Sequence, residues 1–159
     1  MPEVIAVAHD CRKSHPLQHA VMLAVDLVAR SQGGGQWQIN SKHCYNKPFI
    51  KEDYDMKIAE LKKLNPDKNV NKLYTPYLCT GYDLYVTREL RIMCAMALVH
   101  SRIRRVFYGY KIPWGALGSH HQLHLINNLN HHFEVWRGLR ENDCLYLERK
   151  NSDDTDSIS

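Results

Sequence analysis

Three features are missing from this sequence of 159 residues: paired cysteines, an amino-terminal secretion signal and a long apolar run. The five cysteines are scattered and include no CxxC pair: Cys11, Cys44, Cys79, Cys94 and Cys144. An odd, scattered set is not typical of a disulfide framework. The first apolar run, Val4 to Ala8, is too short for a signal peptide. No run approaches the roughly 18 residues that a membrane-spanning helix needs. We therefore expect an intracellular chain with reduced thiols and no membrane contact.

The composition is that of an ordinary globular domain. Hydrophobic residues make up 44% of the chain and charged residues 24%, and the net charge is +4. A chain of this length can bury a hydrophobic core. The mild positive charge permits contact with a polyanion, but an ordinary solvated surface explains it as well.

A strand, a helix and a second strand follow one another in the middle of the chain. Aromatic and β-branched residues predict a strand at Tyr82–Thr87, and a run of apolar residues predicts a helix at Glu89–Ile103. A second short strand is expected at Val106–Tyr108. A strand–helix–strand unit with an apolar helix indicates parallel strands in an α/β fold.

The flanking segments predict further core elements on both sides of this unit. The expected elements are a buried strand at Val4–Ala8, a helix at Leu17–Ser31 that carries an Asp26–Arg30 pair on its exposed side, a strand at Phe133–Trp136 and a helix at Arg140–Arg149. We expect one domain over residues 1–150. Residues 34–76 would form a surface insertion that holds an amphipathic helix at Lys51–Leu64, and residues 151–159 a disordered acidic tail.

Two helix starts match part of the pattern of a zinc deaminase. Such a site combines H-x-E, where His binds zinc and Glu shuttles protons, with P-C-x-x-C, which supplies two thiolates. In this chain His19 is followed by Val21 in place of the Glu. In the second motif Leu90 and Arg91 replace the proline and the first cysteine, and only Cys94 remains. Without further information, His19 and Cys94 are more typical of core residues than of metal ligands.

Several longer runs resemble one family closely. They are YLCTGYDLYVTRE, MCAMALVHSRI, RVFYG and GALG in the middle of the chain, His19–Met22 and Asp26–Arg30 near its start, and Leu129–Phe133 and Trp136–Gly138 near its end. These runs resemble the non-catalytic subunit of the eukaryotic tRNA wobble adenosine deaminase, a member of the cytidine deaminase superfamily that also has valine in place of the catalytic Glu.

The resemblance implies a cytidine-deaminase-like α/β/α fold with a central mixed sheet. It also implies a catalytic partner subunit, adenosine in tRNA as substrate of the pair, and a location in nucleus and cytoplasm. The family has a strand and a helix before the segment that matches Val4–Ala8, and a further tRNA-binding domain. We therefore expect the first strand and helix to be missing from this chain.

The family usually holds zinc with one His and two Cys. His19 and Cys94 match two of these ligands, and Arg91 replaces the third. We expect zinc to be weakened or lost, with the Arg91 guanidinium filling part of the space and bonding Cys94 or a carbonyl group. The alternative is that Arg91 points to solvent and Cys94 is an inert core thiol.

Basic side chains elsewhere are candidates for contacts with tRNA or the partner. Arg102, Arg104 and Arg105 follow the central helix and could meet phosphates. The histidines at 120, 121 and 124 lie in an expected polar loop. The chain is thus predicted to be a non-catalytic subunit, inactive on its own, that pairs with the catalytic subunit. Two alternatives remain: an active zinc-dependent nucleoside or RNA deaminase, against which Val21 argues, and a degraded module that binds neither partner nor tRNA.

Overall fold

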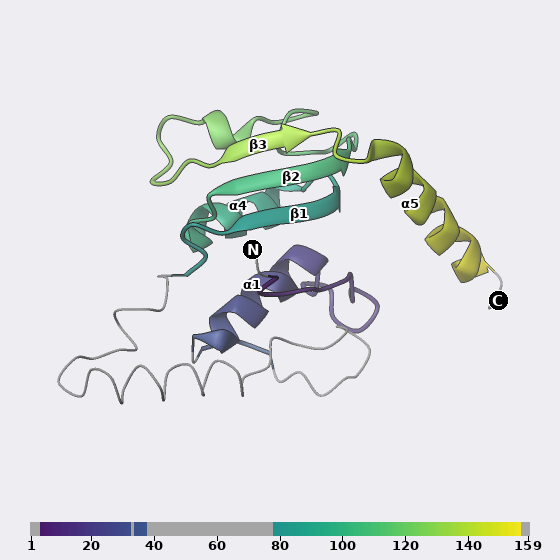
Figure 1. Cartoon of the computed structure of the whole chain (residues 1–159), viewed down its shortest axis with the longest axis horizontal. Coiled ribbons are helices and arrows are strands. Elements are labelled where there is room, and N and C mark those ends of the chain that lie inside the picture. The colour runs from purple at the N-terminus through teal and green to yellow at the C-terminus, as the bar shows by residue number, and fades with distance from the viewer. Residues whose placement is uncertain (1–3, 33, 38–77, 157–159) are drawn as a thin grey trace. The chain divides into compact units, whose positions relative to one another are not determined.

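The computed structural model describes residues 4–32, 34–37 and 78–156 (Figure 1). The chain divides into two compact units, 1–79 and 80–159, and each is described by itself. The predicted amphipathic helix at Lys51–Leu64 and nearly all of the predicted insertion lie outside the described residues.

The first unit contains helix α1, Ala20–Ser31, which confirms all but the first three residues of the predicted helix. Its apolar side is buried through Val21, Leu23, Leu27 and Val28. The helix ends where the N–H groups of Gln32 and Gly34 both donate to the Ala29 carbonyl. These bonds satisfy carbonyl acceptors that the last helical turn leaves open.

Asp26 of α1 is buried, which corrects its expected place on the exposed side of the helix. Its carboxylate accepts hydrogen bonds from the Arg30 guanidinium at 2.8 Å and from the Gln36 backbone N–H at 2.5 Å. A buried carboxylate needs such partners because they replace the water that it loses. Asp26 therefore ties the segment after the helix back to the helix.

The predicted strand at Val4–Ala8 is wrong. These residues form no strand, and Val4 and Val7 are 73% and 54% exposed. An apolar run becomes a strand only where a neighbouring strand accepts its backbone hydrogen bonds. The strands that the structure describes, in the second unit, pair only with one another.

The second unit confirms the strand–helix–strand prediction. Strand β1, Asp83–Arg88, leads to helix α4, Ile92–Ser101, and then to β2, Arg105–Tyr110. The two strands are parallel, with Leu84 opposite Val106. The helix begins three residues later than predicted, since Glu89, Leu90 and Arg91 connect it to β1.

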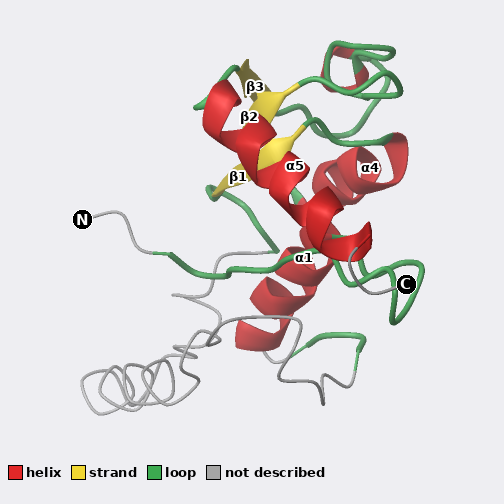
Figure 2. Cartoon of the chain, turned by 90° about the vertical axis from the view of Figure 1, so that its right-hand side faces the viewer, coloured by secondary structure: helices red, strands yellow, loops and turns green. Residues whose placement is uncertain are grey.

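A third strand, β3, Glu134–Arg137, pairs parallel with β2 at the place where a strand was predicted. A one-turn helix, η1, Leu123–Leu125, precedes it. The described sheet is parallel throughout, in the order β1–β2–β3, and its described part has none of the antiparallel pairing of the expected mixed sheet. Figure 2 shows α4 on one side of this sheet.

The two faces of the sheet differ in the side chains that they carry. Val106 and Tyr108 of β2 are buried, as are Ala95, Leu98 and Val99 of α4. The opposite face carries a row of stacked rings from the three strands. Tyr85 and Phe107 lie 4.8 Å apart, and Phe107 and Trp136 lie 6.3 Å apart.

Helix α5, Glu141–Asp156, packs against β2 and β1. At Gly109 of β2 a Cβ atom would lie 2.5 Å from the Cys144 Sγ of α5, so the close approach needs glycine. The helix continues through Asp156 and takes in the first six residues of the predicted disordered tail, which corrects that prediction. None of the described helices is both long and apolar enough to cross a membrane.

Candidate functional site

The start of α1 holds His19 and Val21, which the sequence placed at an altered H-x-E motif. His19 is half-buried and adopts an extended backbone conformation directly before the helix. Val21 lies in the first turn and is 4% exposed. An isopropyl side chain neither takes nor gives a proton, so this position cannot serve as a general acid or base.

The start of α4 holds Arg91 and Cys94, the other half of the altered motif. Arg91 precedes the helix in an extended conformation and its side chain is exposed. Cys94 is 4% exposed within the first helical turn. Arg91 is therefore exposed at the start of α4, whereas the Cys94 side chain is buried.

The residues present do not fit the three-ligand zinc site of the family. A guanidinium carries five N–H donors and no lone pair for a metal, so Arg91 cannot replace a thiolate. No group of three His, Cys, Asp or Glu side chains suited to a metal exists in the described part of the chain. His19 belongs to the first unit and Cys94 to the second.

A buried carboxylate, Glu89, organises the connection between β1 and α4, and the sequence reasoning missed it. Glu89 is only 1% exposed. Its Oε1 accepts the backbone N–H groups of Leu117 and Ser119, each at 3.0 Å. Its Oε2 accepts the Ser119 hydroxyl and, at 3.4 Å, the Ile112 N–H. One side chain therefore holds both ends of the loop at residues 112–119.

Gly115 makes room for this carboxylate. A Cβ atom at position 115 would overlap the carboxyl group of Glu89. The next residue adds a backbone link, since the Ala116 N–H donates to the Leu90 carbonyl at 2.7 Å. The sequence gives no local signal for this contact, because the run GALGS at 115–119 lies far from Glu89 along the chain.

The loop presents aromatic side chains on its outer surface. Trp114 is 64% exposed, and its ring meets His120 edge-on at 4.9 Å. His120 in turn meets His121 at 4.4 Å. Both histidines are exposed, as predicted for this loop. His124 differs, because its Nδ1 is buried with no hydrogen-bond partner among the described residues and burial lowers its pKa.

Two of the three candidate arginines share one carboxylate. Arg105 contacts Asp83 at 2.5 Å, and Arg104 contacts it at 3.0 Å. The hydrogen bond from Arg105 outweighs burial and lowers the pKa of the Asp83 carboxyl group. Arg102 has a weaker partner, the Asn130 carbonyl at 3.5 Å. A phosphate that contacted Arg104 or Arg105 would compete with Asp83.

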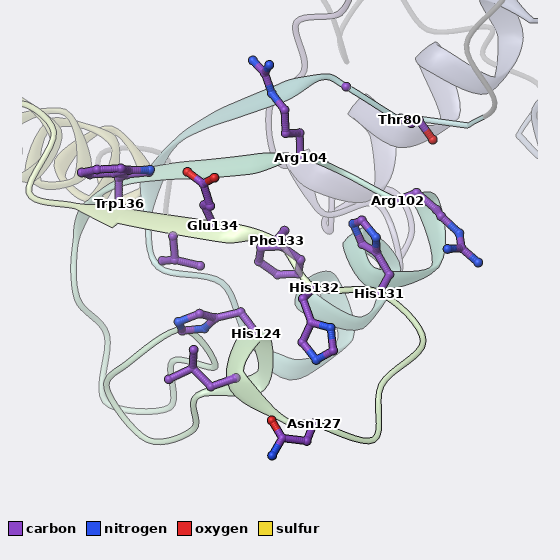
Figure 3. A pocket seen from close by; sticks show the side chains of 13 residues that line it. Thr80, Arg102, Arg104, His124, Asn127, His131, His132, Phe133, Glu134 and Trp136 are labelled. Atoms are coloured by element: carbon purple, nitrogen blue, oxygen red, sulfur yellow. The ribbon is translucent and has the colours of Figure 1, made fainter.

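A groove of about 1030 Å³ lies beside β3 (Figure 3). Arg102 and Arg104 line one end of the groove, and Trp136 of β3 lines the other end. His124 and Asn127 lie across the groove from the strand. It is formed entirely by residues of the second unit.

Comparison with known proteins relates the chain to tRNA deaminases. No protein-family model matches it. It is 48% identical over 144 residues to the probable inactive tRNA-specific adenosine deaminase-like protein 3 of Danio rerio, covering 89% of this chain and 38% of that protein. It is 30% identical over 138 residues to the tRNA-specific adenosine deaminase subunit tad3 of Schizosaccharomyces pombe, covering 85% and 34%. The chain therefore spans less than half the length of these relatives.

One solved chain comes from a study of A-to-I editing by tRNA:A34 deaminases at the wobble position of transfer RNA. The two chains are 38% identical over the matched region, and the TM-score is 0.40. The match covers 42% of this chain and 49% of the solved chain. The sequence identities show that the chain belongs to the family of the tRNA-specific adenosine deaminase-like protein 3 and tad3 proteins.

Proposed function

We propose that this chain acts as the non-catalytic subunit of a tRNA-specific adenosine deaminase. It would pair with a catalytic subunit that carries the proton-shuttling Glu, and the pair would convert adenosine to inosine in tRNA, in the nucleus and cytoplasm. The observation that carries the proposal is Val21, a buried aliphatic side chain where catalysis needs a carboxylate. The names of the relatives, which include an inactive protein and a subunit, support it.

The α4 start supports a structural rather than a catalytic role for this region. Glu89 holds its loop through backbone N–H groups, so this carboxylate is used for folding and is not available to a substrate. We also propose that zinc binds weakly or not at all, because Arg91 supplies no ligand. Loss of one thiolate removes part of an apparent binding energy of roughly 10–16 kcal/mol in structural zinc sites.

The experiment is coexpression of this chain with the catalytic subunit from the same organism. The complex is purified by size exclusion, and inosine in tRNA and zinc per complex are measured on the same peak. We expect a heterodimer that forms inosine and holds one zinc ion. The chain alone should form no inosine. A complex whose catalytic subunit lacks its Glu should form none either.

A matched pair of variants separates the proposal from its rivals. Val21→Ala tests packing, and Val21→Glu restores the missing carboxylate. Activity of the chain alone would identify an active deaminase and overturn the proposal. Failure to form any complex would favour a degraded module. Arg91→Cys should raise zinc binding, whereas stoichiometric zinc on the unchanged chain would contradict the weak-zinc proposal.

A further inference from the structure

The outer edge of β3 carries backbone groups that have no strand partner in the described structure. The Glu134 N–H donates to the Arg104 carbonyl, and the Gly138 N–H donates to the Gly109 carbonyl, each at 3.1 Å. The direction of backbone hydrogen bonding alternates along a strand. Val135 and Arg137 therefore point their N–H and C=O groups away from β2, the one described strand that pairs with β3.

The groove beside β3 follows this edge. Every residue from His131 to Trp136 lines it, together with His124 and Leu125 of η1. Consecutive side chains of a strand point to opposite faces of the sheet. The groove therefore reaches the edge of β3 at Val135, and it continues past Arg102, Arg104, Thr80 and Gly81, which precede β2 and β1. Figure 3 shows His124 and Asn127 on the far side of the groove from Glu134 and Trp136.

We propose that this edge is a docking site for an extended peptide segment of another protein, which adds to β3 as a fourth strand. The backbone groups of Val135 and Arg137 would supply the ladder hydrogen bonds, and the groove would give the specificity. The proposal does not depend on the deaminase role of the chain.

The side chains of the groove define the chemistry of the peptide. Leu125 is 59% and Trp136 is 55% exposed, so apolar side chains of an added strand would bury them further. At the other end, Arg102 forms no ion pair with any described carboxylate. We expect apolar residues at alternate positions of the peptide and an acidic residue next to Arg102.

Two other occupants fit the groove less well. An RNA strand would require several free cations, but the charge of Arg104 is matched by Asp83 and Glu134 adds a negative charge. A second copy of the chain would have to bring the edge of its own sheet up to β3. Because η1 lines the opposite side of the groove, the space suits a single strand better than the edge of a second sheet.

The experiment is selection of peptides from a random twelve-residue phage-display library against the full chain. Selected peptides are synthesised, and their dissociation constants are measured with the unchanged chain and with Val135→Pro. Proline is tolerated on an edge strand where its missing N–H faced outward. Val135→Ala serves as the matched control, since it shortens the same side chain but keeps the outward N–H, and it should bind the peptides nearly as well as the unchanged chain.

A second measurement does not depend on any variant. Each backbone nitrogen of a selected peptide is methylated in turn, which removes one donor at a time. Strand addition predicts a loss of binding of about tenfold or more at every second residue, because only alternate N–H groups face β3. We expect Val135→Pro to weaken the peptides by about tenfold, and Arg102→Gln to weaken those with an acidic residue.

Each other outcome overturns the proposal. No enriched peptide, or N-methyl effects without the two-residue period, would exclude strand addition at this edge. The chain is also tested with a mixed-sequence, twelve-nucleotide single-stranded RNA. If this RNA binds, and if Arg102→Gln weakens the binding but Val135→Pro does not, the groove is assigned to nucleic acid. Self-association of the chain that Val135→Pro abolishes would assign the edge to a second copy.

Discussion

Removal of the Glu89 carboxylate should destabilise the chain more than removal of any exposed carboxylate. In Glu89→Ala, the backbone N–H groups of Leu117 and Ser119 lose their acceptor in a buried site. Each buried donor left without a partner costs about 1–3 kcal/mol. With the cavity added, we expect the free energy of unfolding to fall by about 3–5 kcal/mol.

Glu89→Gln should cost less, about 1–3 kcal/mol. Its amide oxygen can still accept the two N–H groups at the Oε1 position, and the Ser119 hydroxyl can turn to accept from the new NH₂ group. The weaker bond from Ile112 is lost in either variant. Comparison of Glu89→Ala with Glu89→Gln therefore separates the effect of losing the hydrogen-bond acceptors from the effect of losing the carboxylate.

The assay is urea unfolding of the unchanged chain, the two Glu89 variants and Glu134→Gln, an exposed carboxylate on β3 that should change stability by less than about 0.5 kcal/mol. Amide hydrogen exchange adds a local readout, because the N–H groups of Leu117 and Ser119 should exchange faster only in the Glu89 variants. A Glu89→Ala chain within about 1 kcal/mol of the unchanged chain, with both amides still protected, would refute the assigned role of this carboxylate.

Three further predictions concern nearby features. Gly115→Ala should cost about 1–3 kcal/mol in urea unfolding because its Cβ meets the Glu89 carboxyl group, whereas Gly34→Ala, with its nearest atom at 3.4 Å, should be tolerated. The lowered pKa of Asp83 means that the ionised carboxylate stabilises the fold above pH 3.8, and this stabilisation is lost as pH falls below that value. In Asp83→Asn the loss of stability in acid should be smaller. An unchanged dependence of stability on acid pH would contradict the pairing of Asp83 with the arginines. The lowered pKa of His124 means that the folded state resists protonation, so stability should decline as pH falls below 6.5, and His124→Leu should flatten this decline in thermal melts between pH 7 and pH 5.

The sequence by itself determined the helix α1, the strand–helix–strand unit and the family. Periodicity and propensity act over a few neighbouring residues, so runs such as the one around Leu84, Leu98 and Val106 identify their elements without tertiary information. The loss of the proton shuttle at Val21 was likewise readable, because it depends only on which side chain stands there.

Tertiary structure alone decided what depends on neighbours distant in the sequence. The run Val4–Ala8 has strand-forming residues but forms no strand, since a strand requires a pairing edge. Glu89 became a buried anchor only through N–H groups almost thirty residues away. The outward direction of the Val135 backbone likewise follows from the pairing of β3 with β2 and not from the identity of any residue in the strand.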